Sequence, residues 1–150
     1  MLSKKAKYAL KALTVLTNQY GQGPILISDL AGSEGIPRKF LEAILLQLKN
    51  HGILMSKKGK GGGYFLNRAP QTINLGQVIR IVDGPLAPLP CVSLTAYTRC
   101  DECVDEKTCN IRRVMKEVRD STARILEGTT LSEFAGTRTG RQTKTRVRRR

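Results

Sequence analysis

Four cysteines lie close together in the second half of the chain, at Cys91, Cys100, Cys103 and Cys109, in the spacing C-x8-C-x2-C-x5-C. Thiolates are the usual protein ligands of iron–sulfur clusters, and a flexible loop would let them converge. A structural zinc site would also use four thiolates, but it usually shows two close pairs, and only Cys100 and Cys103 form one. A redox-active thiol pair at these two positions ranks third, because it lacks a βαβ context. The spacing favours a cluster and leaves zinc open.

A second group of residues suited to chemistry is basic. Arg38 and Lys39 stand at the start of an apolar-periodic stretch, and three lysines, Lys57, Lys58 and Lys60, surround a glycine-rich turn. Both places are suited to contact with a polyanion. A glycine-rich loop can also cradle a nucleotide phosphate, but here no Gly-Lys-Ser/Thr follows, and no helix begins after the glycines. The arrangement therefore favours DNA over a nucleotide.

Three predicted helices position the first basic group. Residues 3–20 carry an apolar face at i, i+3, i+4 spacing, with Ser3 as the cap and Tyr20 as the last member of that face. Ser28 is expected to cap a short helix, and Pro37 to begin the next one. The buried face of that third helix is predicted to be Phe40, Leu41, Ile44, Leu45 and Leu48. Two helices joined by a tight turn, the second basic at its start, make a helix-turn-helix.

The remaining elements are a hairpin, a helix, a loop and a long helix. Strand-like stretches at 53–56 and 64–66 flank the glycine-rich turn, and Asn74 is expected to cap the next helix. Residues 85–109 form a loop that contains all the cysteines, and Asn110 is expected to cap the last helix. Its apolar stripe is predicted at Ile111, Val114, Met115, Val118, Thr122, Ile125 and Leu126. A helix this long exceeds the needs of a small core, which favours a dimer contact over simple packing.

The charge is unevenly distributed over the 150 residues, whose formal net charge is +14. Residues 1–80 carry 12 Lys and Arg against 3 Asp and Glu, and residues 81–134 carry 7 against 9. Residues 135–150 carry 7 basic residues and no acidic ones, and this low-complexity tail is expected to be disordered. A basic module and a basic tail thus flank a slightly acidic middle, which makes a polyanionic partner the leading expectation.

Several classes of protein are not indicated. The chain has one histidine, His51, and no nucleophile with a base beside it, so nothing predicts an enzyme. No apolar stretch approaches the ~20 residues of a membrane span, and no secretory signal is visible. We therefore expect a cytoplasmic protein with no membrane partner. In that compartment cysteines are more often metal ligands or redox thiols than structural disulfides.

Five stretches of the sequence resemble the Rrf-two family of bacterial transcription regulators. They are KYALKALTVL, FLEAILLQLKNHGIL, KGKGGGYFL, INLGQVIRIVDG and TTLSEF, and the resemblance covers about residues 1–134. The cysteines placed just before the last long helix are similar to those of the family. The resemblance implies a homodimer with an N-terminal winged helix and a long, crossed dimerisation helix. In many members an iron–sulfur cluster controls DNA binding.

The resemblance also implies roles for individual residues. Arg38, Lys39 and Phe40 fall in the base-reading region, with Glu42 at the family's glutamate. Lysines stand in the minor-groove wing where many members have an arginine, so this wing is expected to set sequence preference less sharply. The expected DNA-binding residues are Ser28, Pro37, Arg38, Lys39, Phe40, Glu42, Lys57, Lys58, Lys60, Gly62 and Tyr64.

The resemblance implies a cluster site of three cysteines, often with five residues between the last two, and Cys103 and Cys109 match that spacing. Either Cys91 or Cys100 would complete the site. Arg112 stands where some members have a ligating histidine. The expected ligands are therefore drawn from all four cysteines, and the cluster type, 2Fe–2S or 4Fe–4S, is left open.

These observations together predict a mainly α protein with a small β-wing, built as a winged helix-turn-helix domain plus a long dimerisation helix. The expected divisions are 1–84 (winged helix and following helix), 85–109 (cluster loop), 110–134 (dimerisation helix and end segment) and 135–150 (basic tail). We expect a cytoplasmic homodimer that represses transcription from a palindromic operator in double-stranded DNA. It would sense iron, redox or nitric oxide state through its cluster. The alternative is the same DNA-binding module with a structural zinc or a thiol-redox sensor.

Overall fold

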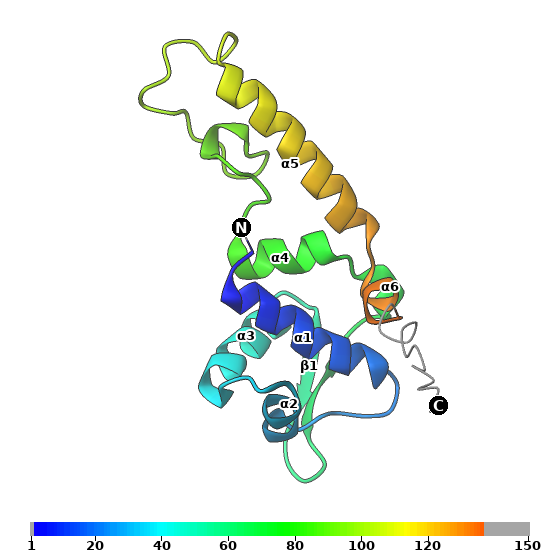
Figure 1. The fold of residues 1–150 in the computed structure, drawn as a ribbon. Coiled ribbons are helices and arrows are strands. Elements are labelled where there is room, and N and C mark those ends of the chain that lie inside the picture. The colour runs from blue at the N-terminus through cyan, green and yellow to red at the C-terminus, as the bar shows by residue number, and fades with distance from the viewer. Residues whose placement is uncertain (1, 137–150) are drawn as a thin grey trace, which may run out of the picture.

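The structure, a computed structural model, describes residues 2–136 and is mostly helical, with one small sheet (Figure 1). Its elements are α1 (Lys4–Asn18), α2 (Ile27–Glu34), α3 (Arg38–Asn50), β1 (Leu54–Lys57), β2 (Gly63–Leu66), η1 (Pro70–Thr72), α4 (Leu75–Asp83), η2 (Pro90–Val92), α5 (Asn110–Gly128) and α6 (Leu131–Gly136). The predicted mainly α fold with a β-wing is confirmed. We call residues 2–84 and 129–136 the body, and residues 85–128 the arm.

The helix-turn-helix forms largely as its local signals predict. Ser3 caps α1, because its side chain accepts a hydrogen bond from the Ala6 backbone N–H. The prediction that Ser28 caps α2 is wrong: the cap position is Leu26, and Ser28 lies in the first turn of the helix. The reason is that Ile25 exchanges two backbone hydrogen bonds with a wing residue, which holds the chain extended until just before the helix begins.

The apolar faces of α1 and α3 build the core of the body. Leu41, Ile44, Leu45 and Leu48 of α3 are fully buried, as predicted. Two aromatic residues assigned to these faces were predicted wrongly. Phe40 is 43% exposed, because it lies in the first turn of α3, beyond the edge of the buried stripe. Tyr20 is 47% exposed, because α1 ends two residues before it.

The hairpin is a two-stranded antiparallel sheet in which Leu54 pairs with Leu66 and Lys57 with Gly63. Two glycines are required by close approach. A Cβ on Gly63 would lie 2.1 Å from the Ile25 carbonyl oxygen, and one on Gly62 would lie 2.2 Å from that of Lys57. Both contacts are shorter than any real Cβ contact, so the wing can close only with glycine at these positions.

The arm leaves the body after α4 and returns to it at α6 (Figure 1). Asn74 caps α4 as predicted, accepting from the Gln77 N–H. The cap of α5 was predicted wrongly: Cys109, not Asn110, occupies it, and its sulfur accepts from the Arg112 N–H. At the other end of α5, the Leu131 N–H donates to the Ile73 carbonyl, which ties the start of α6 back to the body.

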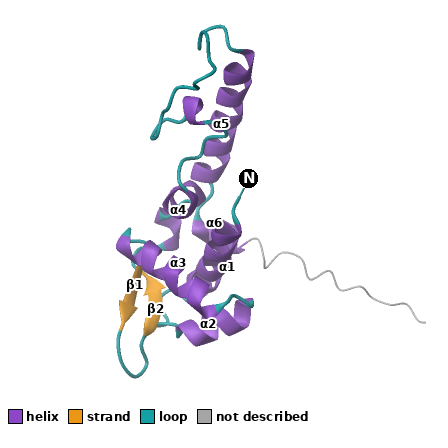
Figure 2. Ribbon diagram, turned by 90° about the vertical axis from the view of Figure 1, so that its left-hand side faces the viewer, coloured by secondary structure: helices purple, strands orange, loops and turns teal. Residues whose placement is uncertain are grey.

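The basic hairpin and the cysteine loop lie at opposite ends of the described molecule. Figure 2 shows the hairpin and α2 at one end, and α5 with the cysteine loop at the other. The basic tail expected at 135–150 lies outside the described residues from 137 onward, and its first two residues belong to α6. Within residues 2–136, no helix combines the length and apolarity needed to cross a membrane.

Candidate nucleic-acid interface and cysteine loop

The start of α3 presents a group of exposed side chains. Pro37 occupies the cap position with φ −56°, and Arg38, Lys39, Phe40 and Glu42 are all exposed. Arg38 Nε lies 3.1 Å from Glu42 Oε1, so this pair prearranges the guanidinium beside the helix start. At 63% and 49% exposure the pair is solvated and adds little stability, which leaves Arg38 available to another anion.

The N-terminal half of α1 supports this surface more than it extends it. The ring of Tyr8 packs edge-on against Phe40, with centroids 5.6 Å apart. Lys5 Nζ donates to the Gln47 side chain, and Lys11 Nζ donates to the Glu34 carbonyl, both at 2.6 Å. These two lysines therefore join helices within the body, which favours a structural role for them over phosphate contact.

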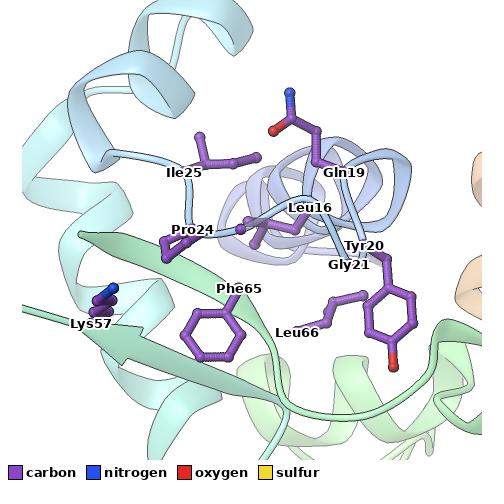
Figure 3. Close-up of a pocket in the computed structure, with 10 residues that line it drawn as sticks. Leu16, Gln19, Tyr20, Gly21, Pro24, Ile25, Lys57, Phe65 and Leu66 are labelled. Carbon is purple, nitrogen blue, oxygen red and sulfur yellow. The ribbon is translucent and has the colours of Figure 1, made fainter. Parts of the chain in front are cut away.

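The wing places its three lysines differently. Lys57, Lys58 and Lys60 are all exposed, and Lys58 and Lys60 lie on the turn. Lys57 lines a pocket of about 400 Å³ at the root of the wing, beside Pro24 and Phe65 (Figure 3). Of the other predicted wing contacts, Gly62 is buried and Tyr64 packs partly buried against the core. Gly62 and Tyr64 thus shape the wing, and Lys57, Lys58 and Lys60 are its exposed charges.

The four cysteines fall into two sets. Cys91 is 8% exposed and lies in η2, against α5. Partial burial raises the pKa of the Cys103 thiol, and Cys109 and then Cys100 raise it further, while Arg99 opposes the rise. Cys103 therefore lies within electrostatic reach of both Cys109 and Cys100, and we call these three cysteines the thiol trio.

The thiol trio does not form a metal site as it stands. Across the described residues, no three His, Cys, Asp or Glu side chains converge closely enough to hold a metal ion. All four cysteines are free thiols. A four-cysteine metal site therefore stays a prediction.

Several polar side chains of the arm make contacts that the sequence did not predict. Arg99 Nη2 donates to the Cys103 carbonyl at 3.2 Å. Tyr97 donates to the Glu106 carboxylate, and this bond raises the pKa of Tyr97. Arg112 and Arg119 bond to carbonyls of η2. No sequence signal distinguishes these residues from a solvated charged loop, except that the resemblance stated above singled out Arg112.

The apolar stripe of α5 is open in the single chain. No residue of α5 is buried, although the helix is 19 residues long. Four large side chains recur along one face at spacings of three, four and seven residues. They are Ile111 at 65% exposure, Val114 at 42%, Val118 at 43% and Ile125 at 62%. Such a face requires a partner surface to exclude water.

Comparisons with known proteins agree with this geometry. Residues 2–137 match the Rrf2 family model, which describes an iron-dependent transcriptional regulator. The chain belongs to the Rrf2 family. A protein of Rhodobacter capsulatus named as an rrf2-like HTH-type transcriptional regulator is 41% identical over 137 residues, covering 89% of this chain and 91% of that one.

Two solved structures extend the agreement to the fold of this Rrf2 protein. CymR, the global cysteine regulator of Bacillus subtilis, superposes with a TM-score of 0.76 at 26% identity, covering 91% of this chain and 97% of that chain. T. potens IscR superposes with a TM-score of 0.70 at 25% identity, covering 92% and 88%. The chain is thus an Rrf2-type transcriptional regulator with the fold of these relatives, and not an enzyme.

Proposed function

We propose that this Rrf2 protein is a homodimer that represses transcription from a palindromic DNA site and senses iron, redox or nitric oxide state through an iron–sulfur cluster in its cysteine loop. The observation that carries the proposal is the position of the thiol trio, at the end of a helix whose long apolar stripe is exposed. A group bound there would act on the element that sets the distance between two DNA-binding bodies. The proposal implies a cytoplasmic protein, because its partner is the chromosome.

DNA binding would use the start of α3 and the turn of the wing. The exposed Arg38 and Lys39 would enter the major groove, where an arginine pairs best with guanine. Lys58 and Lys60 would contact phosphates from the wing, adding affinity without sequence information. The remaining predicted contacts, among them Ser28, Glu42 and Tyr64, would position these groups or line the interface.

Dimer formation would bury the stripe of α5 against its two-fold mate. A symmetric contact of this kind is self-complementary, so the same four apolar side chains serve both protomers. Two recognition helices would then face successive turns of the same duplex, which requires a palindromic site.

The donor set fits an iron–sulfur cluster by its chemistry. Cys100, Cys103 and Cys109 supply three thiols, and Cys109 caps α5, where a backbone N–H already points at its sulfur. N–H bonds to sulfur are among the features that set cluster potentials. When bound, the cluster would supply a redox- and iron-responsive group, of either 2Fe–2S or 4Fe–4S type.

The second candidate is a zinc or thiol-redox sensor on the same DNA-binding module. Its thiol-redox form is favoured because, within residues 2–136, no three His, Cys, Asp or Glu side chains lie close enough to hold a metal ion, and a thiol sensor needs no such geometry. The likeness to CymR, a cysteine regulator by name, points the same way.

Anaerobic purification tests the sensing part of the proposal. The wild-type protein should be brown and contain iron together with acid-labile sulfide. Cys109→Ala should abolish both, whereas the matched Cys91→Ala should keep them, because Cys91 lies outside the thiol trio. A colourless protein that holds one tightly bound zinc and no sulfide would overturn the cluster and leave DNA binding standing.

A further inference from the structure

Arg112 makes three separate contacts at the junction between the cysteine loop and α5. Its backbone N–H donates to Cys109 Sγ at 3.4 Å, and its side-chain Nε donates to the Cys91 carbonyl at 3.3 Å. The same guanidinium lies 3.9 Å from the Glu106 carboxylate. Cys91 begins the cysteine-containing segment and Glu106 lies near its end. One residue therefore fastens both limbs of the loop to the first turn of α5.

Arg119 holds the first limb at a second point, two helical turns further along α5. Its Nη1 donates to the Val92 carbonyl at 2.6 Å, and only 11% of its side chain is exposed. The two arginines thus fix η2 against one face of the helix, while the apolar stripe occupies another. Arginine suits this task because its guanidinium stays charged and presents several donors in one rigid plane.

We propose that Arg112 is a positioning residue that couples the state of the Cys109 sulfur to the orientation of α5. A change at the Cys109 sulfur alters the hydrogen bond that it accepts from the Arg112 N–H. The side chain of Arg112 holds both limbs of the loop. The loop cannot shift relative to the helix without breaking these contacts. The inference rests on the proposed function only in that the thiol trio takes up a metal group.

The first test uses metal-free, reduced protein and follows alkylation of Cys91 by iodoacetamide with peptide mass spectrometry. Arg112→Ala should speed this reaction by about fivefold, the factor expected when one hydrogen bond that holds a buried segment is lost. Arg112→Lys should fall between wild type and alanine, because an ammonium cannot bond both limbs in one plane. Arg113→Ala is the matched control and should leave the rate unchanged, because its exposed guanidinium makes no bond within the described residues.

The second test compares DNA affinity with and without the metal group, loaded from ferrous iron and sulfide under anaerobic conditions. In wild type the two affinities should differ. In Arg112→Ala the cluster absorbance should form, because no ligand is removed, but the two affinities should converge and the visible circular dichroism should change. A role confined to folding would lower both affinities together and keep their ratio.

The outcomes separate this inference from the proposed function. A wild-type protein that takes up no iron and sulfide defeats the cluster, and the affinity comparison is then run with Zn²⁺ alone. The role of Arg112 is overturned, whichever metal binds, by either of two results in Arg112→Ala. One is a Cys91 alkylation rate equal to that of wild type, and the other is an unchanged ratio of metal-bound to metal-free DNA affinity. Far-ultraviolet circular dichroism of Arg112→Lys confirms that a shifted rate is not caused by unfolding.

Discussion

The body buries its apolar side chains within the single chain, whereas the arm leaves them exposed. In the body, side chains from α1, α3 and the wing meet in one core, and residues such as Leu13 and Leu45 are completely buried. In the arm, α5 buries none of its 19 residues, and the cysteine loop is largely exposed from residue 94 to 110. A structure that buries its apolar surface can fold on its own, whereas an exposed apolar stripe gains stability only from a partner.

The arm should open locally more easily than the body. Local opening has a low free energy where apolar contacts are few, and regulatory elements are drawn from such regions. The arm is attached to the body mainly at one end, where Glu127 pairs with Arg80 and approaches Gly76 closely. Its other end holds the thiols. A group bound at the thiols can therefore change the arm while the body keeps its fold.

The largest effect is expected from a charge placed in the stripe of the arm. Val118→Glu should convert the proposed dimer to monomers, because a carboxylate would lie opposite its own copy in an apolar seam. With a single recognition helix, affinity for the palindromic site selected by wild type should fall ~100-fold or more. Sedimentation velocity and titration of that duplex measure the two changes. Arg124→Glu, on another face of α5, should stay dimeric, and a dimeric Val118→Glu would show that the seam lies elsewhere.

The second prediction concerns the core of the body. Leu45→Ala should lower the free energy of unfolding by about 3 kcal/mol, since a fully buried leucine leaves a cavity when truncated. Ile125→Ala on the arm should change it by less than about 0.5 kcal/mol when measured in the monomeric Val118→Glu background. Urea unfolding monitors both. Similar losses in the two variants would contradict the contrast between a self-sufficient body and a partner-dependent arm.

The body was largely predictable from its sequence because its signals are local. Ser3 and Asn74 cap helices by side chains three residues from their partners, and periodic leucines mark the buried face of α3. The errors arose where distant contacts decide. The cap at Ser28 failed because Ile25 pairs with the wing, and Phe40 was assigned to the core although it meets Tyr8 at the surface.

The elements of the arm were predictable from the sequence, but the contacts of its cysteines and arginines were not. The exposed stripe of α5 is visible as a heptad-like pattern, and the cysteine spacing marks a loop. The burial of Cys91, in contrast to the more exposed thiol trio, was not visible, because Cys91 lies in η2, whose carbonyls bond to Arg112 and Arg119 across 21 and 27 residues of sequence. Charged side chains that bond to backbone carbonyls at such separations leave no periodic trace.

The third prediction asks whether DNA contact belongs to the body alone. Lys58→Ala and Lys60→Ala should each weaken binding to all duplexes similarly, because phosphate contacts carry no sequence information. Each should also make the plot of log affinity against log salt shallower by ~1, as expected for one lost phosphate contact. Lys116→Ala, which removes an exposed lysine of the arm, should leave the slope unchanged. Unchanged slopes in both wing variants would remove the wing from the interface.

The smallest effect is expected at α6, the segment that returns the arm to the body. Glu133 accepts from the Thr130 N–H at 2.8 Å and from its hydroxyl at 3.0 Å, while the Glu133 N–H donates back to that hydroxyl, forming a capping box. The Thr130 backbone bond, followed by the hydroxyl bond, lowers the pKa of Glu133 below its ordinary 4.5. Stabilisation by the carboxylate is therefore complete above that ordinary value and disappears as the pH falls through the lower folded-state pKa.

Glu133→Gln should have a slightly lower melting temperature than wild type at pH 7, and this difference should close in acid, whereas Glu117→Gln on α5 should match wild type throughout. A gap that persists at low pH would mean that the side chain acts by packing, and not through its charge.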